Sequence, residues 1–366
     1  MKRLIWMMII GGLLLIALYC LYIIKRMLNF LFPKKSRKMK NLILLGIVAV
    51  VAALCLFVPY GPPFFLYAGL VALLTEPVHL VIYLICKRKP PKFWNVIYRL
   101  CLPAVLLGLV LCVYGAWNIR TIRRTEYTVT SKDIDREMTI LLVSDFHYGT
   151  AQSAETLKDA AAKMNDEHAD LLIIAGDLTD EQTSAEEMHE VVEILGTVSA
   201  QNRIYVFGNH DLSPYSSKEP AFSKEELVTA LKNAGITVLE DETLRISDSV
   251  TVFGRKDRST IREQYSRSEP FAGNEYVISV DHQPSEFVKA DEAGVDLLLS
   301  GHTHSGQMFP LGWMITLTMD SDLLYGRKTM SGGMEAIVTS GISGWGFPVR
   351  TEGISEYVVI HVQPAK

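Results

Sequence analysis

Residues 203–211 read Arg-Ile-Tyr-Val-Phe-Gly-Asn-His-Asp, an apolar run that ends in a glycine and three polar side chains. Unbroken apolar runs of this length are typical of strands buried on both faces of a sheet. The same order occurs earlier, where 137–144 leads into Asp145-Phe146-His147 and 171–175 leads into Gly176-Asp177. Helical patterns at about 154–165 and 184–198 separate these strands. The alternation predicts a layered α/β domain with a mixed sheet or a two-sheet sandwich.

Five polar clusters fall at the carboxyl ends of predicted strands, where ligands collect in open α/β sheets. The clusters are Asp145-Phe146-His147, Gly176-Asp177, Gly208-Asn209-His210-Asp211, Asp281-His282 and Gly301-His302-Thr303-His304. Their carboxylate, imidazole and amide groups suit borderline divalent metals. A turn or a helix cap would explain each cluster alone. Five in this order, each closing an apolar strand, favour a binuclear metal site.

The series D-x-H, G-D, G-N-H-D, H and G-H-T-H resembles the calcineurin-like metallophosphoesterase superfamily over about Glu137–Val362. The segment 339–350, which includes Gly346-Phe347-Pro348-Val349-Arg350, further resembles the membrane-associated bacterial branch of the YkuE/YaeI kind. The resemblance implies a four-layer α/β/β/α sandwich with two divalent ions at one end. Manganese, iron and zinc are the expected metals, and the sequence does not choose among them.

The resemblance also implies the role of each site residue. It implies two ligand groups that share the bridging carboxylate of Asp177, namely Asp145, His147 and His304 for one ion, and Asn209, His282 and His302 for the other. His210 would lie beside the phosphate as a transition-state stabiliser or general acid, and Asp211 would hold its imidazole. A hydroxide bridging the two ions would attack the phosphate directly, with no covalent phospho-enzyme.

The first third of the chain has a different composition. Residues 1–118 carry 14 Lys and Arg and one acid, Glu76, whereas the remainder carries 22 basic and 39 acidic residues. All five cysteines lie in this apolar part, so disulfides and thiolate chemistry are excluded from the polar part. The acidity of the polar part argues against nucleic acid as a partner.

Four apolar stretches are long enough to cross a bilayer as helices. They are Leu4–Ile24, Asn41–Tyr60, Pro62–Cys86 and Leu100–Ile119, with a turn at 59–63. We therefore predict a membrane anchor over 1–119, a connector over 120–136 and a phosphoesterase domain over 137–366. The linker 25–40 and the loop after the third stretch carry most of the Lys and Arg, which predicts that they are cytoplasmic and that the polar domain is extracytoplasmic.

Several residues leave two interpretations open. Glu76 and His79 lie three positions apart within one apolar stretch. They either form part of an ion path or, as we favour, are a structural pair whose charges have partners in the protein. The run Gly254-Arg255-Lys256-Asp257-Arg258 either binds substrate phosphate or is a solvated loop. His168, His189 and His361 are expected to be surface or structural. The last set is aromatic and either lines the rim of the site or packs in the core: Tyr148, Trp313, Tyr325 and Trp345.

We therefore expect a multi-pass membrane protein whose dimetal phosphoesterase domain hydrolyses a phosphodiester or a lipid- or nucleotide-linked ester. A lipid or cell-envelope precursor is a candidate substrate because of the anchor alone. Two alternatives remain. One is a phosphoprotein phosphatase or broad phosphomonoesterase, and the other is a transporter or sensor with a phosphoesterase-like regulatory domain.

Overall fold

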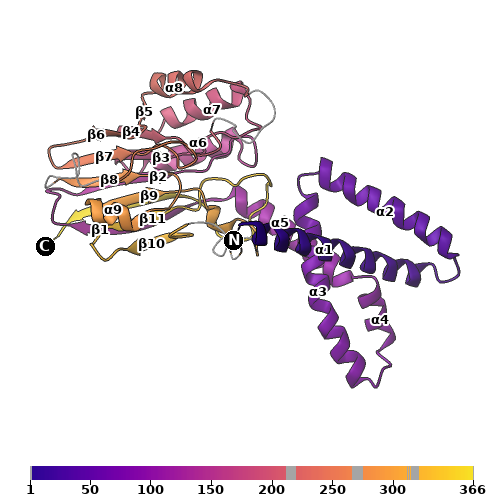
Figure 1. The fold of residues 1–366 in the computed structure, drawn as a ribbon. Helices are drawn as coiled ribbons and strands as arrows, with labels where there is room; N and C mark the ends of the chain where they lie inside the picture. Colours follow the sequence, from indigo (N-terminus) through magenta and orange to yellow (C-terminus); the bar gives the residue numbers. More distant parts are fainter. Residues whose placement is uncertain are drawn as a thin grey trace. The chain divides into compact units, whose positions relative to one another are not determined.

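The computed structural model describes residues 2–211, 220–265, 275–310, 312, 314 and 321–365, with the side chains of residues 2–14 and 17 left aside. The chain forms two compact units, Met1–Ala116 and Trp117–Lys366, each with its own contacts. We call them the helical unit and the catalytic unit and describe each by itself (Figure 1).

The helical unit is entirely α-helical in its described residues. Its helices are α1 (Lys2–Leu31), α2 (Arg37–Phe57), α3 (Gly61–Ile85), α4 (Lys92–Arg99) and α5 (Leu102–Arg120), the last of which ends in the catalytic unit. Among the described residues, α2, α3 and α5 are long and apolar enough to cross a membrane. The remaining predicted stretch, Leu4–Ile24, lies within α1, and much of it falls outside the described side chains.

Two local features of the helical unit follow from sequence. The break predicted at 59–63 is present but shorter, because α2 ends at Phe57 and α3 already begins at Gly61 with prolines in its first turn. Helix α4 was not predicted, since eight residues of mixed polarity give too short a pattern to distinguish from a loop.

The catalytic unit contains two mixed six-stranded sheets. The first has the order β1-β12-β2-β3-β4-β5 and comprises β1 (Ile122–Ser131), β12 (Ser355–Pro364), β2 (Met138–Val143), β3 (Ala169–Ala175), β4 (Ala200–Val206) and β5 (Thr237–Val238). The second has the order β10-β11-β9-β8-β7-β6 and comprises β10 (Gly326–Thr329), β11 (Glu335–Val338), β9 (Leu297–Ser300), β8 (Tyr276–Val280), β7 (Val250–Gly254) and β6 (Glu242–Arg245).

The sheets pack face to face, and helices cover their outer faces (Figure 1). The covering helices are α6 (Ala154–Asn165), α7 (Ala185–Gly196) and α8 (Lys224–Asn233) on the first sheet, and α9 (Phe287–Ala293) on the second. Alternate residues of one strand serve different layers, since Leu141 packs with the helices whereas Leu142 packs between the sheets. This is the predicted four-layer α/β/β/α sandwich.

Serine caps fix where the covering helices begin. Ser153 accepts a hydrogen bond from the Thr156 N–H at the start of α6. Ser184 and Ser223 each form a reciprocal capping box, with Glu187 and Glu226 respectively. The caps at Ser153 and Ser184 lie at the helix starts that the sequence pattern predicts, whereas the helix that begins after Ser223 was not predicted.

The stretch predicted as a connector, 120–136, with a short strand expected at 127–130, contains the ten-residue strand β1. All ten residues of β1 pair in parallel with β12, from Ile122 with Ser355 to Ser131 with Pro364. Charged residues such as Arg123, Arg124 and Glu126 are tolerated there because β1 is an edge strand, and they make its sequence similar to a linker. The catalytic unit therefore begins at Trp117, upstream of the predicted boundary.

We predict that a fragment starting at Trp117 folds and that one starting at Lys132 does not. Without β1, strand β12 loses its neighbour on one side and exposes a long apolar edge, including Val358 and Ile360. Size-exclusion chromatography and thermal melting of the two fragments test this. Equal melting temperatures and monomeric elution of both would show that β1 is a dispensable appendage.

Candidate metal centre

All five polar clusters directly follow parallel strands of the two sheets. Asp145 and His147 follow β2, Asp177 follows β3, and Asn209, His210 and Asp211 follow β4. In the second sheet, His282 follows β8, and His302 and His304 follow β9. The carboxyl ends of these strands bring residues as far apart in the sequence as Asp145 and His304 to one edge of the sandwich.

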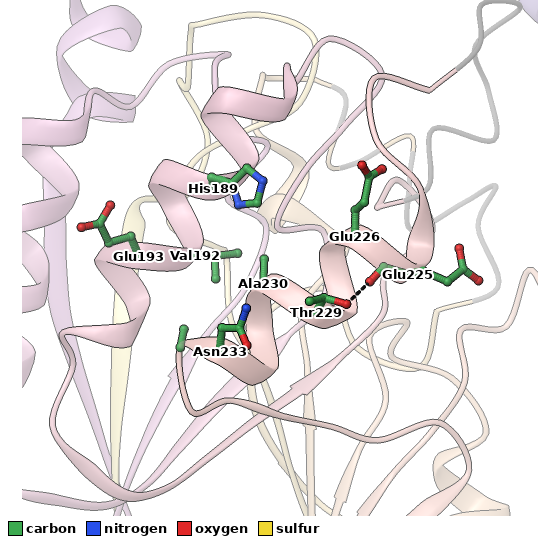
Figure 2. A pocket seen from close by; sticks show the side chains of 9 residues that line it. His189, Val192, Glu193, Glu225, Glu226, Thr229, Ala230 and Asn233 are labelled. Carbon is green, nitrogen blue, oxygen red and sulfur yellow. Dashed lines mark hydrogen bonds between the residues drawn. The ribbon is translucent and has the colours of Figure 1, made fainter.

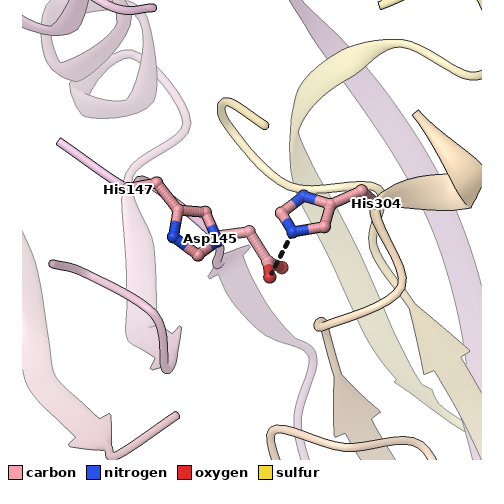
Figure 3. A group of neighbouring side chains, drawn as sticks. All are labelled: Asp145, His147 and His304. Atoms are coloured by element: carbon pink, nitrogen blue, oxygen red, sulfur yellow. Dashed lines mark ion pairs between the residues drawn. The ribbon is translucent and has the colours of Figure 1, made fainter. Parts of the chain in front are cut away.

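The first ligand group consists of Asp145, His147 and His304, whose candidate ligand atoms all lie within 4.8 Å of one another. The Asp145 carboxylate points toward the His304 ring, with 3.6 Å between Asp145 Oδ1 and His304 Nε2, and the His147 ring lies beside them (Figure 3). Asp145 and His147 are fully buried. Two histidines and one carboxylate form a donor set suited to a borderline divalent cation.

The second group consists of Asp177, His282 and His302, within the same 4.8 Å limit. His282 Nε2 lies 3.1 Å from Asp177 Oδ2 and 3.2 Å from Asn209 Oδ1, so the amide of Asn209 also faces this group. Asp177 Oδ2 lies 3.6 Å from His147 Nε2 in the first group. One oxygen of Asp177 is therefore close to imidazoles of both groups, which is the geometry required of a bridging carboxylate.

The hydrogen-bonding state of these atoms shows that the residues fit a metal. Both ring nitrogens of His147, Asp177 Oδ2 and His304 Nδ1 are buried and have no hydrogen-bond partner among the described residues. Such buried polar atoms are costly unless something binds them. Cations between the groups would satisfy several of these atoms together.

Burial also sets the protonation of three of the four ligand imidazoles. Desolvation lowers the pKa of His302 to about 3 and that of His304 to about 4, and it lowers the pKa of His147 well below the ordinary range. These three histidines are thus neutral at physiological pH, the form in which imidazole binds metals. Burial raises the pKa of Asp177 to about 6, because its charge is held in the interior.

The backbone around the ligands adopts an uncommon conformation. Five of the seven predicted ligands have φ in the left-handed region: Asp145 at 55°, His147 at 39°, Asp177 at 51°, His302 at 73° and His304 at 50°. This conformation costs energy for residues other than glycine and is concentrated at functional sites. The ligand loops therefore turn sharply away from the strands instead of continuing their extended backbone.

Two glycines are required by close approach to the ligands. A Cβ at Gly208 would lie against Asp177 Oδ1 and the Asp177 backbone nitrogen. A Cβ at Gly301 would lie against Ser144 Oγ and Asp145 Oδ2. Any side chain at either position would displace a ligand carboxylate, which explains why a glycine stands immediately before two of the polar clusters.

The structure corrects the partner of His210. Its Nδ1 lies 2.7 Å from Glu181 Oε1, so Glu181 holds the imidazole. The Asp211 carboxylate instead accepts four backbone N–H groups, from Asp177 and Gly208 at Oδ2 and from Leu178 and Thr179 at Oδ1. Asp211 thus ties the β4 loop to the β3 loop. Sequence reasoning missed Glu181 because it lies four residues beyond the Gly176-Asp177 cluster, in a loop with no regular period.

Neighbouring groups hold the ligand loops in position. His282 Nδ1 lies 2.7 Å from the Ala175 carbonyl, which fixes the ring so that Nε2 faces Asp177. The fully buried Arg350 donates to the His304 carbonyl at 3.1 Å. These contacts fix the orientation of a ring and of a loop rather than supplying ligand atoms.

Within the run 254–258, the structure corrects both interpretations for Arg255, whereas Arg258 is exposed, as expected of a solvated loop. The Arg255 guanidinium is fully buried, at 3.2 Å from Asp281 and 3.0 Å from Glu286, and it stacks on the Tyr265 ring. Arg262 joins the same two carboxylates at 2.9 and 2.7 Å. Arg255 is therefore a structural cation next to the His282 loop, neither a phosphate ligand nor part of a solvated loop.

Of the four aromatic residues expected either at the rim of the site or in the core, the three described ones include a single residue beside the site. Tyr148 is buried, Tyr325 donates to the buried Glu356, and Trp313 lies outside the described residues. Trp345 is 48% exposed, its ring centroid lies 5.1 Å from that of His210, and its indole N–H points to Glu181 at 3.5 Å. It gives the site an apolar surface beside His210.

Away from the metal ligands, a surface hollow of about 540 Å³ lies between α7 and α8 (Figure 2). It is lined by His189 and three glutamates, Glu193, Glu225 and Glu226. In the part of the chain that the structure describes, the convergent ligand groups are the two at the strand ends, and none includes these residues. His189 is thus a surface residue, as the sequence predicts.

Comparison with known proteins agrees with this site. Residues 138–306 match the calcineurin-like phosphoesterase family, so the chain carries a calcineurin-like metallophosphoesterase domain. Such a domain is that of a metal-dependent phosphoester hydrolase, as the ligand set indicates. The matched segment begins at β2 and ends just after His304.

Similar proteins carry the same designation. An uncharacterized metallophosphoesterase of Helicobacter pylori is 27% identical over 238 residues, covering 63% of this chain and 61% of that protein. YkuE of Bacillus subtilis is 26% identical over 196 residues, covering 51% of this chain and 66% of YkuE. A transmembrane protein with metallophosphoesterase domain from Danio rerio is 26% identical, covering 73% and 64%. Three described helices of this chain are likewise long and apolar enough to cross a membrane.

Among solved structures, a dimetal phosphatase from Danio rerio aligns with a TM-score of 0.38 at 15% identity, covering 59% of this chain and 90% of that chain. The Helicobacter relative extends beyond the aligned region, since this chain covers less than two thirds of its length.

We predict that Asp211→Asn and Glu181→Gln have different consequences. Asn offers one acceptor where the carboxylate offers two oxygens to four N–H groups, so Asp211→Asn should lower the free energy of unfolding by about 2–3 kcal/mol. Glu181→Gln should leave the melting temperature unchanged and lower kcat about tenfold, because it loosens His210. Thermal melting and steady-state kinetics measure the two effects, and the opposite pattern would restore Asp211 as the partner of His210.

Proposed function

We propose that the protein is a membrane-anchored dimetal phosphoesterase that hydrolyses phosphate esters at the edge of its two sheets. The observation that carries the proposal is the juxtaposition of two buried ligand groups around Asp177, with unsatisfied ligand atoms in both. Two divalent cations, when bound, neutralise the phosphate and supply a hydroxide nucleophile near neutral pH.

The residues of the chain would then act as metal ligands and as a proton donor. Asp145, His147 and His304 would hold one ion, and Asn209, His282 and His302 would hold the other, with Asp177 between them. The imidazole of His210 is the partly exposed group next to the ligands, with its ring centroid 5.2 Å from that of His147. We propose that this imidazole contacts the phosphate oxygens and donates a proton to the leaving oxygen. Glu181 would orient the ring through Nδ1.

The substrate class follows from two features of the site surroundings. Trp345 offers an exposed aromatic face beside His210, where the leaving group of an ester would lie. The apolar helices would hold the catalytic unit near a bilayer. Both favour an ester with an apolar or aromatic portion, such as a phosphodiester or a lipid- or nucleotide-linked envelope precursor.

The proposed topology is multi-pass, with the catalytic unit outside the cytoplasm. It rests on the clustering of Lys and Arg in residues 25–40 and 87–92, which places those segments in the cytoplasm. Helix α5 would then carry the chain outward to Trp117.

We predict metal-dependent turnover of bis-p-nitrophenyl phosphate in preference to p-nitrophenyl phosphate. Activity should require Mn²⁺ or another divalent ion and should be abolished by a chelator. Asp177→Ala removes the bridging carboxylate and should lower kcat/KM about a hundredfold or more. Asp248→Ala, the same change at a fully exposed position, is the matched control.

Three outcomes of this assay are informative. Preference for the monoester would favour a phosphomonoesterase or phosphoprotein phosphatase. Two bound ions without turnover of either ester would indicate a narrow natural substrate. Absence of both metal binding and turnover would overturn the metal centre itself.

The orientation gives a separate prediction. Asp248→Cys places a thiol on the surface of a unit that contains no cysteine, and Lys35→Cys places one in the basic linker. A membrane-impermeant maleimide should label Asp248→Cys in intact cells and Lys35→Cys only after lysis. The unmodified chain gives the background from its five native cysteines, and the reverse labelling pattern would invert the topology.

A further inference from the structure

A cavity of about 610 Å³ with a mixed polar and apolar lining lies within the helical unit, among α1, α3 and α4. Its lining is unusual for an apolar helical segment, since it combines three cations, two amides and an apolar side. These six residues are Lys25, Arg26, Arg99, Asn29, Asn95 and Leu18. The cavity belongs to the helical unit alone and shares no residue with the metal centre.

The charge of this cavity is not balanced by protein carboxylates. Glu76 is the only acidic residue before position 119, and it pairs with Arg26 at 2.6 Å. Tyr19 and Tyr98 also donate to Glu76, at 3.1 and 2.6 Å, so both of its oxygens already accept hydrogen bonds. Lys25 and Arg99, both exposed, therefore line the cavity with no carboxylate of the helical unit to neutralise them, and they are available to an external anion.

Stacked rings and a hydrogen bond hold the wall of the cavity in place. The Arg26 guanidinium lies 3.9 Å from the centroid of the Tyr98 ring, and the His79 ring stacks on Tyr98 at 3.6 Å with an interplanar angle of 1°. Trp94 donates its indole N–H to His79 at 3.1 Å. Glu76 and His79 thus have structural partners, as we favoured from the sequence, and they hold α1, α3 and α4 together around the opening.

The amides are oriented as donors. Asn29 Oδ1 accepts from Lys40 Nζ at 3.0 Å, and Asn95 Oδ1 accepts from Arg99 Nε at 2.8 Å. Each amide oxygen is taken by a cation, so each amide offers its N–H groups to a further acceptor. A phosphate group, with several acceptor oxygens, matches this arrangement of cations and N–H donors.

The surroundings point to a lipid rather than a soluble anion. Helix α4 combines Lys and Arg at its ends with Phe93 and Val96, which are 68% and 39% exposed, and such helices lie at the headgroup level of a bilayer. On the α1 side, Leu18 is exposed along the same wall. An acyl chain would lie there while the headgroup enters the cavity.

We propose that this cavity binds the phosphate headgroup of an anionic membrane lipid, with Lys25 and Arg99 pairing with the phosphate and Asn29 and Asn95 donating to it. Basic pockets between membrane helices are suited to such headgroups. In the proposed topology the cavity lies at the cytoplasmic leaflet, so this lipid is distinct from the extracytoplasmic substrate. The binding site does not depend on the phosphoesterase activity.

The test uses the full chain in neutral detergent, with phosphatidylglycerol, phosphatidylcholine and inorganic phosphate as probes. Native mass spectrometry and the shift in melting temperature measure binding. We expect phosphatidylglycerol to bind and stabilise the chain. Lys25→Gln/Arg99→Gln should weaken its binding about 25-fold, since each cation near a headgroup is worth about fivefold.

The matched control is Lys35→Gln/Arg37→Gln, which also removes two positive charges. Both lie in the linker 25–40, to which Lys25 belongs, but outside the cavity lining. It should bind phosphatidylglycerol as the unmodified chain does, and the melting temperatures of both variants without lipid report their folding. Equal weakening by both pairs would reduce the effect to general surface charge and overturn the site. Equal binding of phosphatidylcholine, or binding of inorganic phosphate as tight as that of the lipid, would overturn the anionic-lipid assignment.

Discussion

The placement of Asp177 is the constraint on which the catalytic unit depends. Its carboxylate is buried between histidines that come from both sheets, and burial raises its pKa to about 6, so its charge is tolerated only where cationic partners face it. Its loop is tied to the β4 loop through Asp211, whose oxygens accept N–H groups from both loops. The parallel strands, the facing sheets and the two glycines all serve to bring loops of different strands to this carboxylate.

Much of this could be predicted from sequence because the information was local. Apolar runs marked β2, β3 and β4, and polar clusters marked their ends, so the ligands could be named before their geometry was known. What could not be predicted depended on contacts distant in sequence. Glu181 reaches His210 across two loops, and Arg255 is buried by carboxylates 26 and 31 positions away. The sequence indicates a short strand at 127–130, but the full length of β1 depends on its pairing with β12.

The helical unit shows a related limit of sequence analysis. Hydropathy identified the apolar stretches, since it needs composition alone. The partner of Glu76 could not be read from spacing, because Arg26 lies in a different helix, 50 positions earlier. The ion pair also determines which cations of the cavity lack a carboxylate partner. Once Arg26 is neutralised, Lys25 and Arg99 are the charges that remain for an external anion.

The left-handed backbone at Asp145, His147, Asp177, His302 and His304 has a consequence for how metal is acquired. In small metal-dependent domains the ion organises the chain, and binding is coupled to folding. Here hydrogen bonds within the sandwich, such as those from the His302 N–H to Asp145, already impose the turns. Because the fold meets this conformational cost, we expect the ligand loops to be preorganised for metal, with ion binding less strongly coupled to folding than in such small domains.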